Sequence, residues 1–196
     1  MKKNTLILII VIGVIAVIAF WMMNAYNSMV ALQEEVTTKW SNVESQYQRR
    51  ADLIPNLVAT VKGYAAHESE TLEGVVSARA KATSITIDPS NCTPEQLAEY
   101  QKAQGELGSA LGRLMAISEN YPDLKANTNF LELQEQLEGT ENRIQVSRRE
   151  YNETVQVYNT KIRQFPSNII ASMFSFSQMN KFEADQEAKN APKVEF

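Results

Sequence analysis

The side chains best suited to zinc binding or nucleophilic chemistry occur once each in this sequence, as His67 and Cys92. Catalytic zinc needs several ligands at a recognisable spacing such as H-E-x-x-H, and the letters after His67 read ESET. Cys92 precedes a predicted helix start, which could lower its pKa. A cysteine nucleophile also needs a general base in reach, and the one imidazole lies in another segment. We therefore expect His67 to be a hydrogen-bonded packing residue, and we predict no catalytic residue, no metal site and no cofactor.

The composition excludes several classes of protein. A single cysteine rules out an intrachain disulfide and a multi-cysteine zinc or iron–sulfur site. Seven Gly and six Pro in 196 residues are too few for a loop-rich β-sandwich or a collagen-like repeat. A net charge of −4 argues against a nucleic-acid partner, which needs clustered Lys and Arg. The sequence also lacks a Gly-rich phosphate loop and a G-x-S-x-G elbow, so we predict a protein that is not an enzyme.

Arg50 falls on an apolar stripe of the first segment after the amino-terminal apolar run. An unpaired buried charge is strongly destabilising, so the guanidinium must reach solvent or a carboxylate. We expect it to pair with Asp52, or with Glu68 or Glu150 on a packed neighbour, and so to fix helix register. The alternative is that Arg50 binds an anionic lipid headgroup or a carboxylate of a partner.

Two Tyr-Asn pairs, at 151–152 and 158–159, repeat seven residues apart and therefore point the same way from one helix. Tyr buries a large ring while its hydroxyl finds a partner, and Asn at a seam position selects register. We interpret the pairs as core packing, and a seam shared with another subunit remains the alternative.

The elements that must position these residues begin with an uncharged apolar run at residues 5–23. Its length suits a helix that crosses a hydrocarbon core of about 30 Å. The apolar core is longer than that of a cleaved signal peptide, and no A-x-A site follows it. We predict an uncleaved membrane-spanning helix at 5–25, a short amino terminus at 1–4, a helical domain at 26–180 and a polar, flexible tail at 181–196.

Positive charge beside the span predicts its orientation. Lys2 and Lys3 precede it, and the first cation after it is Lys39. By the positive-inside rule the amino terminus is cytoplasmic and the bulk of the chain extracytoplasmic, with Trp21 and Tyr26 as aromatic anchors at the interface. In a bacterium this means the inner membrane, with a periplasmic bundle if the cell is Gram-negative.

Beyond the span, large apolar residues recur in steps of three and four, the spacing of helices that pack along a coiled-coil seam. The stripe passes Pro55, where we expect a bend within one element, and continues to about Ala82. Residues 83–93 break it. A second helix starts at Thr93 as N-cap, with Gln96 completing a capping box, and ends before Pro122.

A loop at 122–128 and a third long helix at 130–165 follow, and a short apolar helix at 167–176 closes the domain. The sequence therefore predicts an all-α fold, an antiparallel bundle behind a transmembrane helix. The short helix carries a possible contact surface for the membrane, for another copy or for the bundle end. Its residues are Ile169, Ile170, Met173, Phe174 and Phe176.

Two stretches of the sequence resemble the signature regions of the LemA family. The first is WSNVESQYQRRADLIPNLVATVKGYAAHESETLEGVVSARAKA (40–82), and the second is YNETVQVYNTKIRQFPSNIIASMFSF (151–176), which resembles the closing YN, YN, FPSxxIA pattern. The residues that carry the resemblance or that we interpret as structural are Trp40, Arg49, Arg50, Asp52, Pro55, Asn56, His67, Glu68, Arg79, Tyr151, Asn152, Tyr158, Asn159, Phe165 and Pro166.

The resemblance implies a bacterial protein with one amino-terminal membrane helix, a helical-bundle body and no established enzymatic activity. Some members are associated with forming or organising internal membrane compartments. An external amino terminus has also been proposed for the family, but the lysines here favour a cytoplasmic one. We therefore expect a non-enzymatic protein that spans the bilayer once, forms a homo-oligomer or binds a membrane protein partner, and organises or remodels the envelope membrane. The alternative is a monomeric accessory or regulatory subunit of a membrane enzyme or sensor.

Overall fold

The computed structural model describes residues 3–183. Within these residues the chain forms helices and no β-strand, which confirms the predicted all-α class. In chain order the elements are α1 (Lys3–Tyr64), α2 (Ser69–Ser84), α3 (Pro94–Ile117), the 3-10 turn η1 (Ser118–Asn120), α4 (Pro122–Lys125), α5 (Thr128–Arg163) and α6 (Ser167–Met173).

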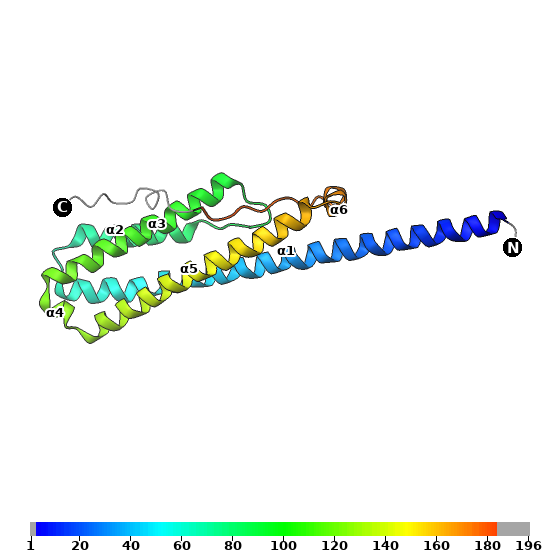
Figure 1. The fold of residues 1–196 in the computed structure, drawn as a ribbon. Helices are drawn as coiled ribbons and strands as arrows, with labels where there is room; N and C mark the ends of the chain where they lie inside the picture. The colour runs from blue at the N-terminus through cyan, green and yellow to red at the C-terminus, as the bar shows by residue number, and fades with distance from the viewer. Residues whose placement is uncertain (1–2, 184–196) are drawn as a thin grey trace, which may run out of the picture.

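The first helix joins the apolar run to the bundle without interruption. Its amino-terminal part projects alone from the rest of the molecule (Figure 1) and is apolar and long enough to cross a membrane. Further on, Met29, Val36 and Trp40 are buried at helix spacing. The helix also continues through Pro55 as one element, as expected, while the bend there stays a prediction. The candidate span and one wall of the bundle are therefore parts of the same continuous helix.

The prediction that this segment runs on to about Ala82 is wrong. The chain turns at residues 65–68, where the Ala65 amide donates to Val61 and the Glu68 amide donates to Ala65. It then returns as α2, antiparallel to α1 (Figure 1). Leu72 of α2 and Val61 of α1 belong to the same core cluster, so the apolar residues of α2 continue the spacing of those in α1. Periodicity alone could not reveal the turn.

The start of α3 is as predicted. The Thr93 hydroxyl accepts from the Gln96 amide at 3.2 Å, and the Gln96 side chain accepts from the Thr93 amide at 2.9 Å. The helix ends earlier than expected, at Ile117; η1 follows where the helix was expected to continue, and α4 occupies part of the predicted loop. The long helix α5 then begins after Asn127, whose side chain caps the Phe130 amide.

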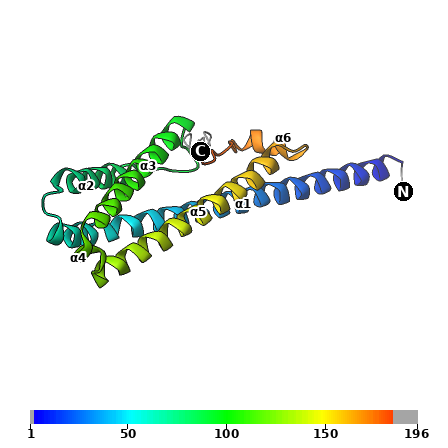
Figure 2. The same ribbon diagram turned by 60° about the vertical axis from the view of Figure 1, so that its left-hand side comes forward.

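The helices pack as two antiparallel pairs, α1 against α5 and α2 against α3, seen side by side in Figure 2. Their buried side chains form two clusters. The first cluster, nearer the projecting end of α1, is centred on Trp40, Tyr151 and Tyr158. The distal cluster includes Ile54 and Leu57. Arg50 lies on α1 between the two.

The end of the domain differs from the prediction. The last helix ends at Met173, and the chain then runs back along α5 (Figure 1). We call residues 177–183 the strap. Its Phe182 is buried, with 6% of its surface exposed, so a flexible tail beginning at 181 is wrong for residues 181–183. These residues are held against the bundle because the ring of Phe182 packs in the aromatic core. Residues 184–196 of the predicted tail lie outside the described part of the chain.

Candidate functional site

Arg50 is the most deeply buried charged side chain described, with 3% of its surface exposed. Its Nη1 donates to Glu141 Oε2 at 2.9 Å, and its Nη2 donates to Gln104 Oε1 at 2.7 Å and to the Gln104 carbonyl at 3.1 Å. The guanidinium also lies over the Tyr47 ring at 5.2 Å. The Gln104 amide donates in turn to the Ala82 carbonyl at 3.2 Å. One cation therefore ties α1 to α3 and α5, and through Gln104 to α2.

The predicted partners of Arg50 are wrong, although its guanidinium does pair with groups on packed neighbouring helices. Asp52 is exposed and accepts from Gln48 at 2.7 Å. Glu68 accepts from the Tyr121 hydroxyl, and Glu150 pairs with Lys39. The reason is that Arg50 faces Gln104 of α3 and Glu141 of α5, whereas Glu150 lies further along α5, beside Lys39. A signal was present for one of the true partners, because Gln104 is a polar residue on the apolar stripe of its own helix, whereas Glu141 is exposed next to the buried Thr140 of α5.

Pro55 and Arg79 together produce a contact between α1 and α2. A proline inside a helix has no N–H, so the carbonyl four residues earlier loses its partner. That carbonyl belongs to Ala51, which is buried, and the Nε of Arg79 donates to it at 2.8 Å. Arg49 and Asn56, from the same motif, are exposed on the outside of α1. The motif therefore divides between an inner and an outer face.

His67 is exposed on the turn between α1 and α2, so the expectation that it packs is wrong. The turn directs residue 67 outward while Ala65 fills the core. Its neighbour Glu68 accepts a hydrogen bond from the Tyr121 hydroxyl at 3.1 Å, and that bond raises the pKa of Tyr121. Within residues 3–183, no group of three or more His, Cys, Asp or Glu side chains could hold a metal ion.

Cys92 is half-buried beside the strap. Burial raises the pKa of its thiol above the ordinary 9.0, and a hydrogen bond from Asn180 opposes the rise. The neutral thiol is therefore favoured at physiological pH, which works against a nucleophilic role. The carbonyl of Cys92 accepts from the Asn180 side chain at 2.8 Å, so this loop helps to hold the strap.

The two Tyr-Asn pairs of α5 bind the backbone of the strap. The Asn159 side chain exchanges two hydrogen bonds with the Met179 backbone, at 2.8 and 3.0 Å. The Asn152 side chain exchanges two with the Phe182 backbone, both at 2.9 Å. The Tyr158 and Tyr151 hydroxyls donate to the carbonyls of residues 177 and 180. We call this set of contacts the Tyr-Asn ladder.

The ladder has a simple geometric basis. Seven residues of α-helix rise about 10.5 Å, and three residues of extended chain cover about 10 Å. A repeat of seven on α5 therefore matches a repeat of three on the strap. The prediction that the two tyrosines are core residues is confirmed, because both are fully buried.

Trp40 lies at the centre of an aromatic cluster that the strap completes. Its ring stacks on Phe182 at 5.5 Å and meets Tyr151 at 5.3 Å and Tyr100 at 5.6 Å. Burial raises the pKa of both tyrosines, so they remain neutral. The strap is thus held by its backbone on the ladder and by Phe182 in the core.

The possible contact surface predicted for the last helix is only partly formed. Ile170 is buried and Phe176 is half-buried, so neither presents an open face. Ile169, Met173 and Phe174 remain exposed. The remaining motif residues, Phe165 and Pro166, form the exposed corner between α5 and α6, and Phe165 has 81% of its surface exposed.

Known proteins are similar in sequence to this chain over most of its length. A model of the LemA family matches residues 39–196. Magnetosome proteins MamQ 1 and MamQ 2 of Paramagnetospirillum magneticum are each 30% identical over 197 residues, covering 92% of this chain and 72% of the relative. Protein LemA of Metamycoplasma hominis is 26% identical over 160 residues, covering 82% of this chain and 69% of the relative.

Proposed function

This chain belongs to the LemA family, and from that membership and the continuity of α1 we propose that it is a non-enzymatic, single-pass membrane protein that organises or remodels the bacterial envelope membrane. It does so through a helical bundle that assembles with itself or binds a partner. The names LemA and MamQ of its relatives are not names of enzymes.

The observation that carries the proposal is that one helix, α1, is both the candidate span and a wall of the bundle. The apolar run has none of its side chains buried, whereas Val36, Trp40 and Val43 of the same helix are in the core. No linker separates the two parts, so the direction of the bundle follows that of the span. An assembly of such bundles would impose an arrangement on the spans and therefore on the bilayer.

Polar side chains inside the bundle support a structural role for it. Arg50 and Gln104 bind each other, and Asn152 and Asn159 bind the strap. These groups are occupied by other parts of the same chain. That use is typical of side chains that specify packing.

Self-assembly is tested by the mass of the full-length protein in mild detergent, measured by light scattering and followed by negative-stain imaging. We expect a uniform assembly of many subunits. A monomer at every concentration would overturn self-assembly.

The importance of helix continuity is tested in vesicles. Full-length protein is compared with a variant that carries a short Gly-Ser insertion after Asn27, where the span meets the bundle. We expect the intact protein, and not the insertion variant, to change vesicle shape in electron micrographs. Equal effects of the two proteins would contradict the proposal.

One observation favours a second function, that of a monomeric accessory or regulatory subunit. The Tyr-Asn face of α5, which was a candidate seam between copies, is covered by the strap of the same chain. This alternative predicts that a membrane enzyme or sensor co-purifies at fixed stoichiometry with a monomeric protein.

The orientation we propose is the one given by the lysines, with the bundle outside the cytoplasmic membrane. A Cys92→Ser variant that carries Glu138→Cys on the exposed surface of α5 tests it. A membrane-impermeant thiol reagent should label this cysteine in intact spheroplasts. Labelling only after lysis would show the opposite orientation.

A further inference from the structure

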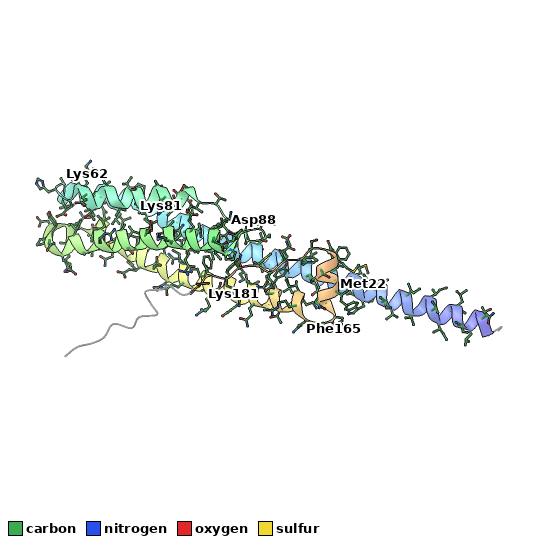
Figure 3. All side chains as sticks on the ribbon, turned by 90° about the horizontal axis from the view of Figure 1, so that it is seen from above. Met22, Lys62, Lys81, Asp88, Phe165 and Lys181 are labelled. Carbon is green, nitrogen blue, oxygen red and sulfur yellow. The ribbon has the colours of Figure 1, made fainter. Side chains whose placement is uncertain are left out.

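The corner between α5 and α6 lies beside the point where α1 leaves the candidate span. Figure 3 shows α6 at the end of the bundle from which α1 projects, near the labelled Met22 and Phe165. The ring of Phe174 meets that of Tyr26 on α1 at 4.8 Å, and Phe176 meets it at 5.6 Å. The corner is therefore fixed in height relative to the span.

That height corresponds to the interfacial layer of a bilayer. Tyr26 follows the last residue of the apolar run, Met23, by three residues, a rise of about 4.5 Å. The polar layer on each side of a hydrocarbon core is about 5–7 Å thick. With α1 inserted, Tyr26 and the side chains packed on it fall within this layer.

The side chains presented at this height are apolar. Phe165, Ile169, Met173 and Phe174 have 81, 49, 61 and 52% of their surfaces exposed. On α6, Ile170 and Ala171 face the bundle, which leaves Ile169 and Met173 on the outside. Aqueous exposure of this set would be unfavourable, and a contiguous apolar patch is typical of a contact site.

The charge pattern points to lipid as the occupant. Residues 164–180 contain no Asp, Glu, Lys or Arg, and neither do residues 4–33 of α1. These are the two segments that meet at Tyr26. Arg163 directly precedes the corner and is exposed, whereas Lys181 lies further along the strap, where its Nζ donates to Gln156. An uncharged apolar patch with a cation at its edge suits the boundary between acyl chains and anionic headgroups.

We propose that the corner formed by Phe165, Ile169, Met173 and Phe174 is a second membrane contact, which inserts into the interfacial layer beside the span. The proposal rests on membrane insertion of α1. Its consequence is that the bundle cannot rotate freely about the axis of α1. Tilt and rotation of a span are set by such interfacial anchors, so the corner fixes which face of the bundle is turned toward the bilayer and which faces are free for a partner.

The test uses full-length protein in vesicles of phosphatidylcholine and phosphatidylglycerol, with a polarity-sensitive fluorophore on a single cysteine in a Cys92→Ser background. Met173→Cys places the fluorophore on the corner, and Val157→Cys places it on a similarly exposed apolar site of α5. We expect the label at 173 to emit at shorter wavelength and to lose most of its emission to a quencher attached near the lipid headgroup. The label at 157 should do neither.

A third label, at Ile15→Cys, lies near the middle of the span and is read with a quencher attached to the acyl chains, which separates this inference from the proposed function. Quenching at 15 and not at 173 would overturn the interfacial contact alone. Absence of quenching at both positions would overturn membrane insertion itself. If the label at 173 is shielded only when copies are crowded, and not at high dilution in lipid, a second copy covers the corner and the assignment to lipid is overturned.

Discussion

Arg79 of α2 donates from its Nε to the Ala51 carbonyl of α1 at 2.8 Å, and this is the carbonyl that Pro55 leaves without a helical partner. The proline of α1 and the arginine of α2 therefore act together. The proline opens an acceptor inside a buried wall of the bundle, and the arginine of the returning helix fills it. This pairing holds α2 against α1 at one register.

The first prediction concerns this pairing. Arg79→Ala should lower the free energy of unfolding by about 1–3 kcal/mol, because the buried Ala51 carbonyl loses its partner. In a Pro55→Ala background the loss should be smaller, since the new amide of residue 55 can donate to Ala51. The measurement is urea unfolding of the full-length protein in detergent. The exposed Arg113→Ala is the matched control, and equal losses in the two backgrounds would show that the proline and the arginine act independently.

The second prediction ranks the two partners of Arg50. Gln104 is buried, whereas the Glu141 side chain is 48% exposed. Gln104→Met keeps the volume but removes the nearest acceptor from a buried cation, and it should lower the free energy of unfolding by about 2–3 kcal/mol. Glu141→Ala should lower it by less than about 1 kcal/mol, because water screens an exposed ion pair. The reverse ranking in urea unfolding would mean that the ion pair, not the amide, satisfies Arg50.

The sequence predicted contacts between residues that are close in the chain, and it missed contacts between residues that are far apart in it. The capping box at Thr93 depends on residues three apart, and it was predicted in full. The turn after Tyr64 was missed because the apolar spacing of α2 continues that of α1. Arg50 was recognised as a cation on an apolar stripe, but the choice of Glu141 over Glu150 depends on the height at which α5 crosses α1. The apolar residues of the strap show no helix or strand periodicity. Its binding by Asn152 and Asn159 therefore depends on the path of the chain along α5, which the sequence does not predict.

The third prediction concerns pH. Hydrogen bonding and charge attraction from Lys39 lower the pKa of Glu150 below its ordinary 4.5, and Glu150 raises the pKa of Lys39. A carboxylate whose folded-state pKa is lowered stabilises the fold above its unfolded-state pKa and loses that effect as pH falls through the folded-state value. For the lysine, the effect is present below its ordinary 10.5 and is lost as pH rises through the raised value.

The coupling between Lys39→Met and Glu150→Gln, measured by a double-mutant cycle, should therefore be constant near neutral pH and disappear in acid, below the lowered pKa of Glu150. The Lys81–Glu106 pair joins α2 to α3 and provides a reference for an exposed pair elsewhere in the bundle. A Lys39–Glu150 coupling that survives full protonation of the carboxyl would contradict the assignment to charge.

The last prediction uses Cys92 as a built-in probe of the strap. Asn159→Ala removes both hydrogen bonds to Met179 and should loosen the strap, including Asn180, which binds the Cys92 loop. Exposure of the thiol removes the burial that raises its pKa, so the pKa should fall toward the ordinary 9.0. The thiolate fraction then increases, and Cys92 should react faster with a thiol reagent at every pH below that value. Asn142→Ala, at an exposed position of the same helix, is the matched control, and equal rates in the two variants would mean that the ladder does not hold the strap.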